Sequence, residues 1–418
     1  MDIMIVPLPL FDRNMTVEAY LLNYQKGNDF LTVKDSESDS DDCDSSPALD
    51  TLDSVGIDAF TIDQPVFVPI SAKMLLEDLP ARCAHPSNRV VFLVNIDAPP
   101  EEQYFEAIRE LHSQGFRIAY RAVSDMTENA AWLALGDYII INVAKNSESD
   151  VDAKLKIISA AFRNLTVVAS GVATPDMLPG LYERGFKLFE GNFYRVPVSR
   201  DNNKASPLQM NLIRLINLVR DDSFEFKDVA ETVRNDTALS VSLMRLINSP
   251  YIGLRQRVKN IQHAVIILGQ REVRKWVTTS VARLLGADVP SEITKLSLTR
   301  AKLCENLAPL FDLQKESASV FMMGLFSVLD VILGVDVESA FEMVHVSADV
   351  QQALVEKKGR YAPLWEFMLA YESANWPEVS RQMIMHNFSL AQVYDTYVDA
   401  ISWYSDLVLG EVYDGTGL

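Results

Sequence analysis

The residues of this 418-residue sequence best suited to chemistry are basic side chains between positions 234 and 283. Nine lysines and arginines stand there against two acids, and six of them lie close together: Arg255, Arg257, Lys259, Arg271, Arg274 and Lys275. Such groups bind phosphates and acidic protein surfaces. We therefore predict a partner-binding face here. A solvated face, or an internal partner for an acidic segment, explains the same charges and is the favoured interpretation.

Metal-ligating side chains show no recognisable spacing. Cys43, Cys83 and Cys304 form no close pair, and the five histidines offer no zinc or haem signature. The run from Asp35 to Ser54 is rich in serine and aspartate but lacks the spaced ligands and central glycine of a calcium loop. It is interpreted as a disordered, solvated insert, and we predict neither a metal nor a cofactor.

Composition limits the function classes. The chain carries 38 basic and 57 acidic residues, a net charge of -19, which disfavours general nucleic-acid binding. A hydrophobic fraction of 48% predicts packed cores. The N-terminus has no basic, apolar secretory pattern, and no apolar run reaches the roughly 20 residues of a membrane span. We expect a soluble cytoplasmic protein.

The elements that must position these residues differ between the two halves of the chain. Before about residue 200, β-branched runs alternate with helical periodicity, which is typical of an α/β fold. Eight candidate strands, the number that a closed (β/α)8-like barrel needs, lie near Ile3, Val17, Val66, Arg89, Phe116, Asp137, Leu165 and Phe186. Functional residues of such a barrel belong at the C-terminal strand ends.

After a polar stretch from Arg200 to Pro207, apolar residues recur at helical spacing almost to the end. Gly269 is placed to end one helix just before another. We predict two domains, an α/β domain over residues 1–200, with the acidic insert at about 35–54, and an all-α domain over 201–418.

Two stretches carry a resemblance to a known family. One is FDRN (Phe11 to Asn14) opening a strand, followed by the strand order above, and the other is NDTALSVSLMRLINSPYIGLRQRVKNIQHAVIILG (Asn235 to Gly269). Together they resemble an EAL domain joined to an HDOD domain, as found in bacterial cyclic di-GMP signalling. The resemblance implies a barrel followed by a helical HDOD domain.

Active EAL domains open cyclic di-GMP with water held between two divalent cations, which need several carboxylates, and a lysine. Carried onto this chain, the first glutamate falls at Leu21, and the nearby arginine at Asn23 or Gln25. The metal-site asparagine falls at Pro69 and the glutamate of the next strand at Leu93. The paired aspartates fall at Arg121 and Ala122, the catalytic lysine at Ile140 and the next acid at Asn142. The late glutamates fall at Ser170 and Ala173. Only Glu190, where the family often has glutamine, keeps a functional polar type. The apolar strand ends fit a barrel mouth that is packed closed or covered by a partner, and plain core is the favoured interpretation.

The helical half resembles the HD phosphohydrolase fold, whose histidine-aspartate pair would fall here at Ser327 and Val328, with Asp330 nearby. The departures of this chain from both motifs therefore predict no catalysis in either domain.

Our prediction from sequence is a non-catalytic signalling regulator that binds protein partners through its HDOD domain, with homodimerisation as a further possibility. The resemblance links it to motility, attachment or biofilm formation. Cyclic di-GMP is an unlikely partner on this interpretation. Two alternatives remain, a cyclic di-GMP receptor that binds without hydrolysis and a residual phosphodiesterase.

Overall fold

The computed structural model describes residues 3–26, 46–96, 98–122, 126–196, 207–219, 224–248, 258–286 and 289–413. Of the expected disordered insert at 35–54, residues 35–45 lie outside these ranges. Residues 46–54 do not fit that expectation, since Ser46 caps a helix over Pro47–Val55 in which Ala48, Leu49 and Leu52 are buried. Two compact units divide the chain. Unit 1 comprises residues Met1–Val196, Lys302–Ser317 and Pro363–Leu418, and unit 2 comprises Pro197–Ala301 and Ala318–Ala362. The two units therefore alternate along the chain. The division into domains 1–200 and 201–418 assumed one crossing point, and it stays a prediction.

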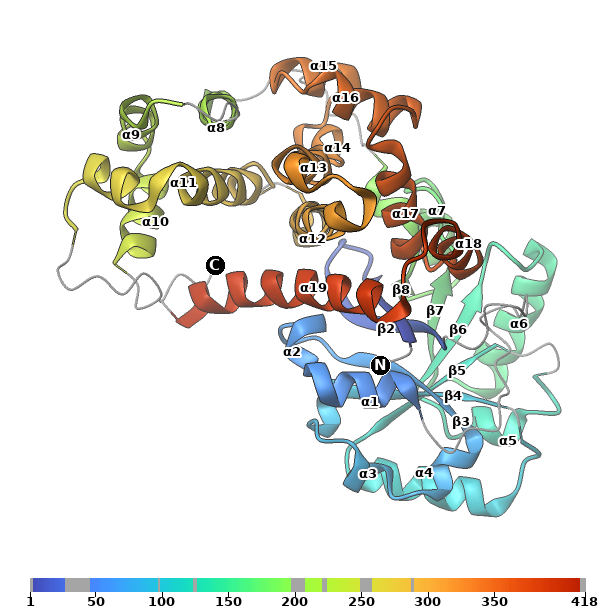
Figure 1. Cartoon of the computed structure of the whole chain (residues 1–418). Helices are drawn as coiled ribbons and strands as arrows, with labels where there is room; N and C mark the ends of the chain where they lie inside the picture. The colour runs from blue at the N-terminus through green and yellow to red at the C-terminus, as the bar shows by residue number, and fades with distance from the viewer. Residues whose placement is uncertain are drawn as a thin grey trace. The chain divides into compact units, whose positions relative to one another are not determined.

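Unit 1 is built on a closed barrel of eight strands in sequence order (Figure 1). The strands are β1 (Ile3–Phe11), β2 (Val17–Lys26), β3 (Val66–Ser71), β4 (Val90–Asn95), β5 (Arg117–Arg121), β6 (Tyr138–Asn142), β7 (Thr166–Ser170) and β8 (Leu188–Phe189). All eight candidate strands are present, and the prediction of an α/β barrel followed by a helical region is confirmed.

β1 departs from a regular (β/α)8 barrel because it runs antiparallel to both β2 and β8. The cause is the turn between β1 and β2. Asp12 Oδ1 accepts hydrogen bonds from the backbone amides of Asn14 and Thr16 at 2.8 Å each, and Met15 takes a φ of 66°. A connection this short returns the chain antiparallel, since a parallel return needs a longer crossover.

The barrel interior is filled by apolar side chains from successive strands. They are Leu10, Ala19, Leu21, Phe67, Val91, Leu93, Ala119, Ile140, Val168 and Leu188. Because side chains alternate along a strand, these residues fix which positions of each strand face inward. The interior is a packed core, as in other small barrels.

Helices cover the outside of the barrel between the strands. They are α1 (Pro47–Val55), α2 (Ile57–Phe60), α3 (Leu79–Arg82), α4 (Glu102–Ser113), α5 (Ala130–Leu133), α6 (Glu148–Ala161) and α7 (Met177–Glu183). The chain also returns to unit 1 at its end with α17 (Ala362–Glu372), α18 (Trp376–His386) and the long helix α19 (Leu390–Tyr413), which contacts α2 and β1.

Unit 2 is helical in its described residues. Its first helices are α8 (Pro207–Leu218), α9 (Phe226–Arg234), α10 (Thr237–Ile247) and α11 (Ile261–Leu285). α12 (Ser291–Leu307) and α13 (Ser317–Phe326) follow, then α14 (Leu329–Leu333), α15 (Val337–Met343) and α16 (Ala348–Gln351). Gly269 interrupts α11 with a φ of 76°, which confirms that it ends one helical segment before the next. None of the helices in the described residues is long and apolar enough to cross a membrane.

Candidate functional site

A ring of polar side chains lies at the carboxyl ends of strands β2 to β8. Two residues on from the last inward-facing core position, strands β2 and β4 to β8 each carry a polar side chain. On β3 that position is Pro69, and the polar residue with the same orientation, Ser71, lies two residues further along. We call these residues the mouth ring: Asn23, Ser71, Asn95, Arg121, Asn142, Ser170 and Glu190. Two neighbouring pairs are in direct register, Ser71 with Asn95 and Asn142 with Ser170. Barrels of this kind place their functional residues at this end.

The segment of the mouth ring on β6 to β8 is held by backbone amides. Asn142 Oδ1 accepts hydrogen bonds from the amides of Ala144 and Lys145, both at 3.0 Å, and Glu190 Oε2 accepts one from Gly171 at 3.1 Å. Gly171 has a φ of +78°, and a Cβ there would lie 3.1 Å from Asn142 Oδ1. Glycine at this position thus lets the β7 loop approach both polar side chains.

The segment on β2 and β3 has a different environment. Asn23 Oδ1 accepts a 3.0 Å hydrogen bond from the indole Nε1 of Trp376 in α18. The Ser71 Oγ is buried and has no hydrogen-bond partner among the residues that the structure describes. Buried hydroxyls are usually hydrogen-bonded, so this one indicates a site for a water or a ligand atom.

The positions where the resemblance places metal ligands divide into two layers. Leu21, Leu93 and Ile140 are 2%, 0% and 2% exposed and belong to the apolar interior below the mouth ring. This agrees with their interpretation as plain core. Arg121, Asn142 and Glu190 instead stand in the mouth ring above it.

The family's pair of divalent cations does not fit the described part of the barrel. The mouth ring contains one carboxylate, Glu190, together with the guanidinium of Arg121. No group of three histidine, cysteine, aspartate or glutamate side chains suited to a metal ion occurs among the residues that the structure describes. Each such cation needs several oxygen ligands, and one carboxylate beside a guanidinium does not supply the negative charge for two cations.

In unit 2, the position of the HD pair is occupied by a hydrogen-bonded serine. Ser327 Oγ donates to the carbonyl of Gly324 at 2.7 Å and accepts from the Arg300 Nη1 at 3.0 Å. Arg300 is 5% exposed. Burial raises the pKa of the nearby Asp330 carboxyl above its ordinary value. These side chains form a buried polar contact between α12 and the end of α13.

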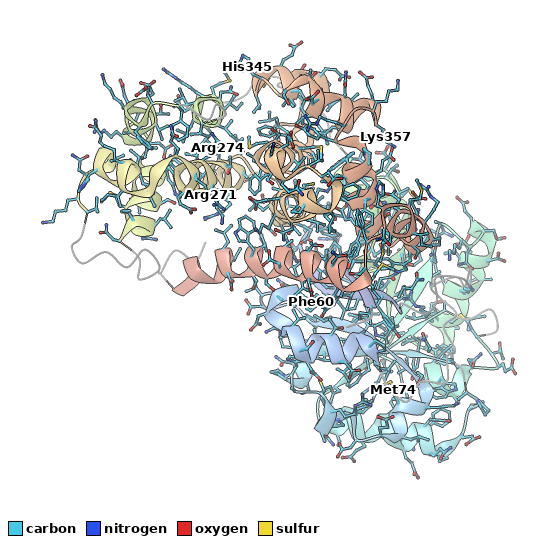
Figure 2. All side chains as sticks on the ribbon, in the orientation of Figure 1. Phe60, Met74, Arg271, Arg274, His345 and Lys357 are labelled. Atoms are coloured by element: carbon cyan, nitrogen blue, oxygen red, sulfur yellow. The ribbon has the colours of Figure 1, made fainter. Side chains whose placement is uncertain are left out.

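The six predicted basic residues are only partly brought together. Arg255 and Arg257 lie outside the described residues. Lys259 is exposed just before α11, and Arg271 and Lys275 are exposed in the first turns that follow Gly269. Arg274, labelled in Figure 2, is half-buried, and its Nε donates a 2.8 Å hydrogen bond to the carbonyl of Val219. The partner-binding role of these residues stays a prediction.

Comparison with known protein families gives a match for the helical part of the chain. The HDOD domain family model matches residues 206–357. These residues form an HDOD domain. Over most of its length the chain is also similar to two curated bacterial proteins. An uncharacterized protein of Bacillus subtilis, YuxH, is 24% identical over 414 residues, 98% of this chain and 99% of YuxH. The cyclic di-GMP phosphodiesterase CdgJ of Vibrio cholerae is 26% identical over 344 residues, 82% of this chain and 78% of CdgJ.

Two solved structures, of which the first has an EAL domain, are each similar to the chain over 46% of its length. YkuI of Bacillus subtilis, solved with cyclic di-GMP and calcium, shows 16% identity, a TM-score of 0.34 and 54% coverage of its own chain. BlrP1 of Klebsiella pneumoniae shows 14% identity, a TM-score of 0.35 and 54% coverage. The expected architecture, an eight-stranded barrel followed by a helical region that matches the HDOD domain, is confirmed. At these TM-scores the structural likeness carries no argument about the site.

Three predictions from sequence are contradicted by these relatives. The chain was expected not to be an enzyme, to act only as a non-catalytic regulator, and not to bind cyclic di-GMP. A relative that matches 82% of it is a cyclic di-GMP phosphodiesterase. The expectations rested on the joint loss of the family's first glutamate, paired aspartates and lysine, which fall at Leu21, Arg121, Ala122 and Ile140. Leu21 and Ile140 lie in the interior core. The mouth ring above that core was not recognised as a set, although the period of two along each strand would have revealed it.

Proposed function

We propose that this chain is a cyclic di-GMP phosphodiesterase that binds the dinucleotide at the mouth ring and hydrolyses a phosphodiester bond to give the linear product. The observation that carries the proposal is the 26% identity to CdgJ of Vibrio cholerae over 82% of the chain. We further propose that it acts in the cytoplasm, in the control of motility, attachment or biofilm formation.

The chemistry of the mouth ring supports a nucleotide ligand. Amide side chains such as Asn95 and Asn142 can donate to and accept from the edge of a guanine base. Arg121 offers a positive charge to a phosphate, and Glu190 is a carboxylate able to accept a proton from water. Because Glu190 already accepts from the Gly171 amide, its carboxylate is held in a fixed orientation.

Turnover of cyclic di-GMP by the purified full-length chain tests the proposal. Reactions with magnesium, with manganese and with a chelator are analysed for the linear dinucleotide by chromatography. We expect linear product from the unaltered chain and a loss of at least ~10-fold in Glu190→Gln, since general acid-base groups contribute about 10²–10⁴-fold. Glu183→Gln, at an exposed position at the end of α7, is the matched control and should retain the full rate. Absence of linear product in all three conditions would refute hydrolysis.

We also propose that Lys259, Arg271, Arg274 and Lys275, with Arg255 and Arg257, bind an acidic protein partner. Arg271 and Lys275 lie four residues apart in one helix, and so share a face. Reversing the exposed charges in Lys259→Glu, Arg271→Glu and Lys275→Glu should abolish partner capture from lysate of the source bacterium. Capture that is unchanged by the triple reversal argues against the surface. The control reverses Lys227 on α9.

A further inference from the structure

Arg121, the positively charged residue of the mouth ring, lies on an arc formed by three adjacent strands. Ser71 on β3 is in register with Asn95 on β4, and β5, which carries Arg121, pairs with β4. Leu93 pairs with Ala119, so two residues further along each strand Asn95 and Arg121 are neighbours. The arc therefore brings a hydroxyl, an amide and a guanidinium to one side of the mouth.

We infer that Arg121 binds a phosphodiester group of cyclic di-GMP directly. The guanidinium takes the place of a divalent cation and neutralises the negative charge of the phosphate. This inference rests on the proposed function and deepens it. A guanidinium presents several N–H donors in a planar fork that matches two phosphate oxygens. It repels a divalent cation at the same place, so the positive charge that the ligand needs comes from the side chain.

A second observation also indicates a ligand at this arc. Within the described part of the chain, the buried Ser71 Oγ has no hydrogen-bond partner. A hydroxyl can donate to a phosphate oxygen, and the loss of water around a buried donor is offset only when such a partner is present. The Asn95 side-chain amide stands between the two in strand order and can donate to the same group.

Calorimetric titration of the full-length chain with cyclic di-GMP in the presence of a chelator tests this assignment. We expect the unaltered chain to bind without a divalent cation, and the affinity to fall as sodium chloride is raised, because the contact is between charges. Arg121→Gln should weaken binding by about 10- to 100-fold, the range for a hydrogen bond to a charged group. Arg121→Lys, which keeps the charge and loses the fork, should weaken it less.

The matched control is Arg109→Gln on α4, an exposed arginine that forms an ion pair with Glu102 of the same helix. It should bind as tightly as the unaltered chain. Thermal unfolding of each variant shows whether it is folded. If Arg121→Gln does not fold, Arg121→Lys and the salt dependence of the unaltered chain decide.

The possible results separate this inference from the proposed function. Binding by the unaltered chain that Arg121→Gln leaves unchanged overturns the role of Arg121 and keeps the proposed function. Binding that requires magnesium or manganese also overturns the direct contact. No binding of cyclic di-GMP under any condition overturns both.

Discussion

Two aspartates six residues apart show how strongly local environment decides the behaviour of one residue type. Burial raises the pKa of the Asp330 carboxyl on α14 above its ordinary value. Asp336 is exposed at the start of α15 and accepts hydrogen bonds from the Ser339 amide and hydroxyl, both at 2.8 Å, which lower its pKa. The ionised form of Asp330 is destabilised by burial, whereas the ionised form of Asp336 is stabilised by its hydrogen bonds.

These opposite shifts predict opposite effects of pH on the stability of unit 2. A raised pKa in the folded state means that the stability contributed by Asp330 is present below the ordinary pKa and lost as pH rises through the folded value. Asp330→Asn should therefore remove that loss and flatten the dependence of stability on pH. Asp336 contributes stability above its ordinary pKa that is lost as pH falls through the lowered value.

Denaturant unfolding of both variants between pH 3 and 8 measures the effect. Asp336→Asn keeps one capping oxygen but removes the charge and one acceptor oxygen, and it is the comparison variant of opposite sign. It should weaken the loss of stability as pH falls. If the stability of Asp330→Asn falls with rising pH as steeply as that of the unaltered chain, the burial argument is wrong.

At the scale of elements, the long hairpin of β1 and β2 depends on helices from the end of the chain. Tyr371 of α17 is 1% exposed, and its hydroxyl accepts from the Ile5 amide at 3.3 Å and donates to the Ile5 carbonyl at 3.2 Å. Trp376 of α18 donates to Asn23, which lies on β2. Burial raises the pKa of the Tyr371 phenol, so its hydroxyl keeps the proton that it donates.

Tyr371→Phe should destabilise unit 1 by about 1–3 kcal/mol, because it removes one hydroxyl and leaves a buried backbone amide and carbonyl without that partner. The free energy of unfolding in urea measures the loss. Tyr182→Phe, which removes a hydroxyl that accepts from Arg13 near the surface, should cost less than about 0.5 kcal/mol. Equal losses in the two variants would mean that the Ile5 contact does not hold the hairpin in place.

At the scale of the whole molecule, sequence position and compact unit do not coincide. Residues 363–418 follow the HDOD match at 206–357, yet they belong to the same unit as the barrel. The Ser405 hydroxyl of α19 donates to the Asp58 carbonyl at 2.5 Å, and Arg195 pairs with Glu372. The predicted all-helical character of this region is confirmed, but apolar spacing alone could not say which surface its helices would cover.

The sequence by itself determined the eight strands and the helical half, because the periods of two and 3.6 are local properties of the chain. It also located the EAL and HDOD resemblance and the break at Gly269. Only the tertiary structure decided that Leu21, Leu93 and Ile140 fill the barrel while Asn23, Asn95 and Asn142 surround its mouth. Closure of the sheet sets which face of each strand is inside, and pairs residues from strands that are far apart in sequence. For the same reason, no local pattern could place Trp376 beside Asn23.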